Sequence, residues 1–157
     1  MPGYDSKTDQ LLRNEETRNE MIFKVIPPSH PSLPSVIRSS IGAPTKEKIV
    51  QVLQSYTQPN QYLVGAFDKE KLVGVIGFQL TLSQAIIRHI SVQRDYRGKG
   101  IGRDLVHFLS QEFHPCTIEA ETDEEALGFY QSLNFACQPF QGTYGSQYSC
   151  LLDLTRK

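Results

Sequence analysis

The hexapeptide RGKGIG at residues 97–102 places three glycines in alternation behind an arginine. Glycine costs a regular element about 0.5–1 kcal/mol relative to alanine, so three glycines at a predicted helix start require a reason. Amides at a helix N-terminus point outward without partners, and the helix dipole favours negative charge there. Glycines let the backbone approach a bulky anion, while Arg97, Lys99 and Arg103 add positive charge. The segment therefore predicts a phosphate or diphosphate site.

Two familiar phosphate loops do not fit this segment. The dinucleotide pattern G-x-G-x-x-G requires a third glycine where Arg103 stands, and no G-x-x-x-x-G-K-[ST] motif occurs in the chain. A flexible turn between a strand and a helix is the structural alternative. It explains one or two of the glycines rather than three.

The elements that must position this loop follow from hydrophobic spacing. Alternating or continuous apolar runs predict strands, and apolar residues three and four apart predict amphipathic helices. Thr45 and Asp123 are typical helix N-caps, and Asn134 stands where a left-handed helix end is expected. The order of elements indicates one mixed α/β domain. We expect strands from residue 21 and at 62–68, 71–80, 85–92, 117–122 and 148–154, helices over 45–56, 101–113 and 123–135, and a loop between 29 and 44.

Composition excludes several classes of protein. A formal net charge of −1 over 157 residues gives no basic surface for nucleic acid. The longest apolar run, 72–78, is far too short to cross a membrane, and the polar N-terminus is unlike a signal peptide. Three cysteines without C-x-x-C spacing are interpreted as reduced thiols with no zinc site. These features together predict a cytoplasmic location.

The first 20 residues are strongly polar and contain no apolar face beyond one pair of leucines. We interpret them as a disordered arm or a leader, and we place the single domain at 21–157. Deletion of residues 1–20 should therefore leave the fold and the affinity for the predicted phosphate ligand intact. Thermal unfolding of the shortened chain tests this, and a fall in Tm of many degrees would show that the arm is packed.

Two segments carry a resemblance to a known family. VQRDYRGKGIGRDLVHFL at 92–109 resembles the acetyl-CoA loop of the GNAT acetyltransferase superfamily, whose pattern is Q/R-x-x-G-x-G/A, with Arg97, Gly100 and Gly102 at its fixed positions. DEEALGFYQSLNF at 123–135 resembles the second family motif, N-x-x-A-x-x-F-Y-x-x-x-G-F. Asp123 replaces its asparagine and Asn134 its glycine. The similarity runs from about residue 62 to the C-terminus.

The resemblance implies a mixed, mostly antiparallel sheet, flanked by helices, that splays into a V between the strand before the loop and the strand after the next helix. CoA would occupy the V. Its pantetheine arm would pair with the strand edge, and its diphosphate would rest on the loop amides. The cofactor-binding residues implied are Ile90, Ser91, Val92, Arg97, Gly98, Lys99, Gly100, Ile101, Gly102, Arg103, Asp123 and Tyr130.

The resemblance also implies a reaction, in which an amine attacks the acetyl thioester directly and no metal takes part. Tyr130 stands at the family's phenol position, and a phenol with a pKa near 10 can protonate the leaving thiolate. The structural alternative is an aromatic residue that only packs its helix. Asp123 cannot donate the amide hydrogen bond of an asparagine, so it could serve as an N-cap alone.

The general base is left open. Glu119 and Glu121 share one strand face, but Ile86 and Ile118 stand where a base glutamate is expected. Water or a residue of the acceptor loop is the alternative. His89 could also titrate usefully, although a lone strand histidine is more often a packing residue.

The acceptor is set in this superfamily by segments that correspond to 29–56 and 141–148, and neither carries an acidic or a basic cluster. The prediction is an acetyl-CoA-dependent N-acetyltransferase that acts on a small-molecule or peptide amine, without nucleic-acid or membrane partners. A homodimer is compatible with the resemblance. The alternative is a non-catalytic acyl-CoA-binding module with a regulatory or interaction role.

Overall fold

The computed structural model describes residues 21–142 and 145–155, so the predicted arm at 1–20 lies outside the described residues. Seven strands form a single sheet in the order β1-β2-β3-β4-β5-β7-β6. The strands are β1 (Met21–Val25), β2 (Gln61–Asp68), β3 (Lys71–Leu80), β4 (Gln84–Val92), β5 (Thr117–Thr122), β6 (Ala136–Gly142) and β7 (Gly145–Asp153).

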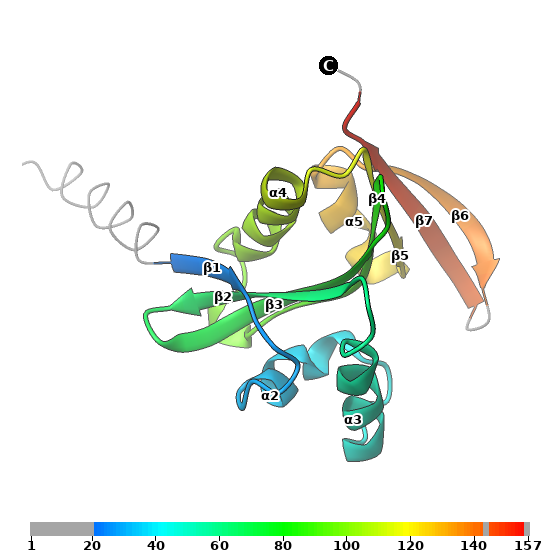
Figure 1. Cartoon of the computed structure of the whole chain (residues 1–157). Coiled ribbons are helices and arrows are strands. Elements are labelled where there is room, and N and C mark those ends of the chain that lie inside the picture. The colour runs from blue at the N-terminus through cyan, green and yellow to red at the C-terminus, as the bar shows by residue number, and fades with distance from the viewer. Residues whose placement is uncertain (1–20, 143–144, 156–157) are drawn as a thin grey trace, which may run out of the picture.

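Helices cover both faces of this sheet (Figure 1). One face carries α2 (Leu33–Ile37), the short 3₁₀ helix η1 (Arg38–Ser40) and α3 (Lys46–Ser55), and the other carries α4 (Ile101–Phe113) and α5 (Glu124–Ser132). Each face has its own core of buried apolar side chains, which includes Ile37 of α2 and Leu63 of β2 on one face and Leu105 of α4 and Ile118 of β5 on the other. Among the described strands, β4 and β5 are the only parallel pair. The predicted mixed, mostly antiparallel α/β fold is confirmed.

Helix ends agree with their sequence signals. The Thr45 hydroxyl accepts a hydrogen bond from the Lys48 amide at 3.1 Å, and the Asp123 carboxylate accepts one from the Ala126 amide at 3.0 Å. Asn134 has a φ of 69° just after α5, which is the left-handed conformation that an asparagine tolerates well. These three residues therefore place the ends of α3 and α5 where the sequence predicts them.

Two parts of the chain differ from the sequence-based expectation. The segment predicted as a loop at 29–44 contains α2 and η1, because Pro34 suits a first helical turn and Leu33, Val36 and Ile37 are buried against the sheet. At the other end, β6 precedes the expected last strand. Its Pro139 hides it from a strand pattern, but β6 lies at the sheet edge, where a missing amide is tolerated.

The prediction of three reduced thiols is wrong for two of them. Cys137 on β6 and Cys150 on β7 form a disulfide, and only Cys116 is free and exposed. The two residues face each other in the register of an antiparallel pair with their Cα atoms 4.1 Å apart, which brings their side chains together. This disulfide joins the edge strand β6 to the sheet.

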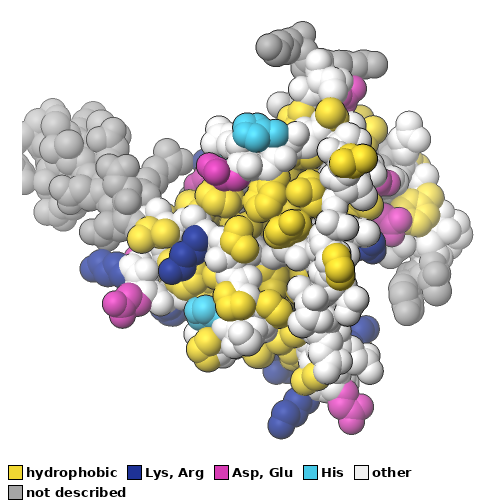
Figure 2. All heavy atoms as spheres, in the orientation of Figure 1, with side chains coloured by type: hydrophobic (Ala, Val, Ile, Leu, Met, Phe, Trp, Pro, Cys, Tyr) yellow, Lys and Arg dark blue, Asp and Glu magenta, His cyan; other side chains and the backbone are white. Residues whose placement is uncertain are grey.

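Surface charge is spread thinly over the visible face of the molecule. Figure 2 shows apolar side chains near the middle of this view and Lys, Arg, Asp and Glu side chains scattered mostly around its margin. Within 21–142 and 145–155, no helix is long and apolar enough to span a membrane, and no group of three or more His, Cys, Asp or Glu side chains is placed to hold a metal ion.

Candidate active site

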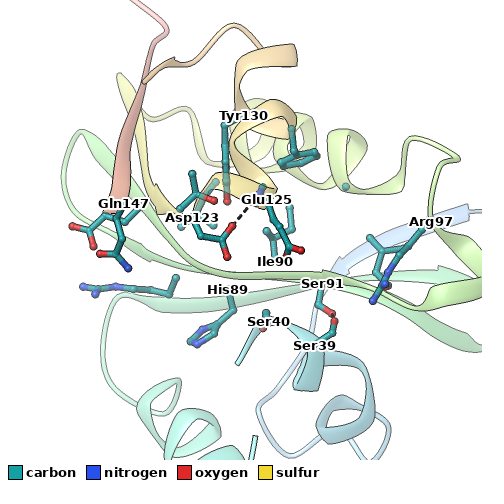
Figure 3. Close-up of a pocket in the computed structure, with 18 residues that line it drawn as sticks. Ser39, Ser40, His89, Ile90, Ser91, Arg97, Asp123, Glu125, Tyr130 and Gln147 are labelled. Carbon is teal, nitrogen blue, oxygen red and sulfur yellow. Dashed lines mark hydrogen bonds between the residues drawn. The ribbon is translucent and has the colours of Figure 1, made fainter. Parts of the chain in front are cut away.

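A cavity of about 690 Å³ lies where β4 and β5 separate (Figure 3). The two strands pair only from Gln84 opposite Thr117 to Ile87 opposite Ala120. Arg88 has no partner residue on β3, because Gly77 faces His89 and Phe78 faces Ile87, so β4 carries a bulge at this point. Beyond the bulge, none of the described strands pairs with β4 on its β5 side. The predicted V-shaped opening is thus present.

The backbone of β4 offers hydrogen-bonding groups to this opening. In an antiparallel ladder, successive residues direct their N–H and C=O groups to alternate sides. The Gln93 amide donates to the Val73 carbonyl of β3 at 2.8 Å, so Ser91 also faces β3, whereas Ile90 and Val92 face the open edge. Arg97 Nε already donates to the Val92 carbonyl at 2.9 Å. The edge therefore presents the backbone N–H and C=O groups of Ile90 and the N–H group of Val92.

The glycine loop follows η2 (Arg94–Tyr96) and leads into α4. Gly98 and Gly100 have φ angles of 77° and 83°, in the left-handed region that favours glycine. Gly100 is the N-cap of α4, and no side chain in the described part of the chain caps this helix. Its first amides therefore keep free donors for an anion. A loop of this geometry fits the predicted diphosphate site.

The structure separates the predicted loop residues into two groups. Arg97 and Gly102 line the cavity, whereas the Lys99 ammonium lies 5.4 Å from the centre of the Tyr96 ring and the Ile101 side chain is buried in the core. Arg103 folds over Gly100, since a Cβ built there would lie 2.7 Å from Arg103 Nη2. The predicted residues that line the cavity are Ile90, Ser91, Val92, Arg97, Gly102, Asp123 and Tyr130, and those that do not are Gly98, Lys99, Gly100, Ile101 and Arg103.

Tyr130 directs its hydroxyl into the cavity. The residue is only 4% exposed and packs edge-on against Phe129 and Phe135. Its hydroxyl makes no hydrogen bond with the described residues. Every fully buried side-chain nitrogen or oxygen of these residues has a hydrogen-bond partner, so the Tyr130 oxygen is not fully buried and contacts the solvent of the cavity. Burial raises the pKa of Tyr130 to about 12, so the phenol keeps its proton at neutral pH.

Carboxylates reach the cavity mainly from β5 and α5. Glu121 and Glu125 line it, and Asp123 does so while capping α5. Glu119 instead accepts a hydrogen bond from Gln84 Nε2 at 3.0 Å, and Ile118 is completely buried in the core. Of these two glutamates on β5, Glu119 therefore makes a structural contact and Glu121 lines the cavity.

His89 lines the same cavity from β4. Burial, aided by the nearby Arg88, lowers the pKa of His89 from 6.5 to about 4. The unfolded chain then binds more protons than the folded chain between these values. The free energy of unfolding should fall as the pH drops from about 6.5 to 4. Thermal unfolding over this range measures the effect, and the slope should be smaller in His89→Gln. An equal slope in both proteins would show that His89 titrates normally.

Several cavity residues were not predicted from the sequence. Ser39 and Ser40 come from η1, inside the segment expected to be a loop, and Ser39 donates to the Ser91 hydroxyl, which in turn donates to the Val36 carbonyl at 2.6 Å. No spacing signal marks them. Phe129 stands next to Tyr130 in a motif that the sequence did identify. The unpredicted lining residues are Ser39, Ser40, Ile87, Arg88, Thr122, Glu125, Ala126, Phe129 and Gln147.

Comparison with known proteins gives one family and several structural relatives. Residues 38–143 match the family model described as the acetyltransferase (GNAT) domain. An aminoglycoside 6'-acetyltransferase type Ii is 21% identical, with 84% of this chain and 96% of that chain covered and a TM-score of 0.71. A GNAT family acetyltransferase from Elizabethkingia anophelis with acetyl-CoA bound is 16% identical, with 87% and 99% covered and a TM-score of 0.66.

A third solved structure widens the range of acceptors among the relatives. The ribosomal-protein-S18-alanine N-acetyltransferase from Escherichia coli is 20% identical, with 83% of this chain and 90% of that chain covered and a TM-score of 0.62. A comparison with curated proteins gives no match. The structural likenesses show a shared fold, and the family model covers more than half of the 157 residues. The chain therefore belongs to the GNAT acetyltransferase family.

Proposed function

We propose that this chain transfers the acetyl group of acetyl-CoA to a primary amine of a small molecule or peptide by direct attack of the amine. The observation that carries the proposal is the position of the Tyr130 hydroxyl, which opens into the cavity formed where β4 and β5 part. A proton donor in the cavity can protonate the leaving sulfur, and a free strand edge can bind the amides of the pantetheine arm.

The residues present fit the co-substrate along its length. The free groups of Ile90 and Val92 suit the amides of the pantetheine arm, which would add to β4 as a short strand does. The left-handed Gly98 and Gly100 expose the first amides of α4 to the diphosphate. Arg97, beside Val92 at the cavity wall, adds a positive charge to that end.

Proton handling falls to Tyr130 and to the solvent of the cavity. Acetyl-CoA supplies an activated thioester, and the amine must lose a proton while the departing sulfur gains one. The Tyr130 hydroxyl donates to the sulfur. Since Ile118 is buried where a base glutamate is expected, water or a residue of the acceptor side takes the proton of the amine.

The acceptor segments proposed from the sequence flank the cavity. Ser39 and Ser40 reach it from 29–56, and Gln147 reaches it from 141–148, of which residues 143 and 144 lie outside the described part. Relatives with this fold are named for aminoglycoside and for protein-alanine acceptors. We therefore extend the proposal to both small-molecule and peptide amines.

A thiol-release assay tests the proposal. Acetyl-CoA is mixed with the full chain and a panel of small and peptide amines, and free CoA thiol and acetylated amine are both measured. We expect thiol and product in equal amounts with at least one primary amine. Tight binding of acetyl-CoA without transfer to any amine would instead support a non-catalytic acyl-CoA-binding module.

A further inference from the structure

A buried tyrosine and a strand histidine form a pair beside the cavity. Tyr56, which follows α3 and is 4% exposed, lies with its hydroxyl oxygen 2.5 Å from Nδ1 of His89 on β4. The two rings meet edge to face with centroids 5.6 Å apart. A side chain at Gly77, the residue opposite His89 on β3, would overlap the Tyr56 hydroxyl, so this glycine makes the contact possible.

This contact determines which ring nitrogen carries the proton. Burial raises the pKa of Tyr56, so its hydroxyl stays protonated. The hydroxyl has no other hydrogen-bond partner among the described residues, and an O–H buried without an acceptor is costly. Tyr56 therefore donates to Nδ1 of His89. A neutral imidazole that accepts at Nδ1 carries its proton at Nε2.

The Nε2–H group of His89 is free and accessible. His89 is neutral near pH 7, because its pKa lies well below that value. Nε2 has no hydrogen-bond partner among the described residues. Since every fully buried side-chain nitrogen of these residues does have one, Nε2 is not fully buried and contacts solvent. Its lone pair is used at Nδ1, which makes His89 a hydrogen-bond donor here rather than a base.

His89 lines the cavity on the side opposite the proposed proton donor. In Figure 3, His89 and Ser40 lie on one side of the β4 ribbon and Tyr130 lies on the other. Nearby hydroxyls are already committed as donors, since Ser39 donates to Ser91 and Ser40 donates to the Ile37 carbonyl at 2.7 Å. His89 thus offers a neutral donor on the side where Ser40, from the predicted acceptor segment 29–56, also lines the cavity.

We propose that Tyr56 and His89 together form a specificity determinant for the acceptor. The Tyr56 hydroxyl holds His89 in the Nε2–H form, and this N–H binds an oxygen atom placed next to the reacting amine. The preferred acceptor is then an amine with a hydroxyl or carbonyl oxygen on the carbon next to the one that bears the amino group. This inference rests on the proposed function and names the class of its acceptor.

The first test measures the tautomer directly and needs no acetyl transfer. Nitrogen-15 NMR of the imidazole rings of the full chain, with His89 assigned by its loss in His89→Gln, should show the Nε2–H form at neutral pH. Tyr56→Phe keeps the ring but removes the hydroxyl, and it should give a mixture of the two neutral forms. A predominant Nδ1–H form in the unsubstituted chain would overturn the inference.

The second test uses pairs of amines that differ only in a hydroxyl replaced by a methyl group. The pairs are ethanolamine with n-propylamine, and 1-amino-2-propanol with isobutylamine. The readout is the ratio of kcat/KM for the hydroxylated amine to that for its alkyl partner, compared between proteins so that differences in amine basicity cancel. His89→Leu should lower this ratio by roughly tenfold, the value of one net hydrogen bond. His89→Gln should keep the ratio, because its side-chain amide offers an N–H near the place of Nε2.

The outcomes separate three roles for His89. A loss of about 10²–10⁴-fold with both amines of a pair in His89→Gln would identify a general base and contradict the donor role. An equal ratio in His89→Leu and in the unsubstituted chain would also overturn it. A chain that binds acetyl-CoA but acetylates no amine contradicts the proposed function, whereas the tautomer measurement still decides on the Tyr56–His89 pair by itself.

Discussion

Replacing Tyr130 by phenylalanine should lower kcat by about 10²–10⁴-fold, which is the usual contribution of a general acid. The substitution removes only a hydroxyl that makes no hydrogen bond with the described residues, so the packing of the ring on Phe129 and Phe135 remains. The affinity for acetyl-CoA should change little. Steady-state kinetics with a reactive amine and calorimetric titration of CoA measure the two effects separately.

Tyr62→Phe is a matched control for this substitution. Tyr62 packs on Phe78 of β3 with ring centroids 5.7 Å apart and is not part of the cavity wall, so its hydroxyl should not matter for turnover. If Tyr130→Phe and Tyr62→Phe turn over at similar rates, Tyr130 is a packing residue and the proton reaches the sulfur from another source.

Replacing Gly100 by valine should lower the affinity for CoA by a hundredfold or more. The valine side chain would displace the diphosphate, which would lose several hydrogen bonds from the loop amides. Each such bond to a charged group is worth about 1.5–3 kcal/mol, so the loss of two already lowers the affinity by more than a hundredfold. Affinity for pantetheine, which lacks the diphosphate, should change little. Calorimetric titration with both ligands provides the comparison, and equal weakening of the two would mean that the loop does not hold the diphosphate.

The structure adds a second effect to this substitution. With an ordinary φ angle, valine would stabilise the free protein by about 0.4–1 kcal/mol. At Gly100, however, valine should destabilise the free protein. A branched side chain is strained at a φ of 83°, and the Arg103 guanidinium is folded over this position. Thermal unfolding should show a lower Tm for Gly100→Val. Gly128→Ala, at an open position of α5, is the control and should raise no such penalty.

The sequence predicted the parts of the site that local signals determine. Alternating glycines before an amphipathic helix mark a loop whose backbone leaves the usual φ range, and the structure has two positive φ angles there. Asp123 and Asn134 mark the ends of the helix that carries Tyr130. The opening between β4 and β5 was expected only through the family resemblance, because no local pattern says where two parallel strands stop pairing.

The acceptor side depends on contacts between distant segments and was not predictable in this way. Tyr56 and His89 are 33 residues apart, and their contact requires a glycine at position 77 of a third element. The bond between Cys137 and Cys150 likewise depends on the register of β6 and β7, and β6 itself was hidden by its proline. Long-range pairing, rather than composition, decides these features.

Amide NMR of the full chain titrated with CoA tests the central claim most directly, because it locates the co-substrate without relying on turnover. If CoA occupies the opening between β4 and β5, the amide signals of Ile90 and Val92 and those of residues 98–103 should shift together and saturate at one concentration. Shifts confined to the β6–β7 edge or to α2 and α3, with the Ile90, Val92 and 98–103 signals unmoved, would contradict it.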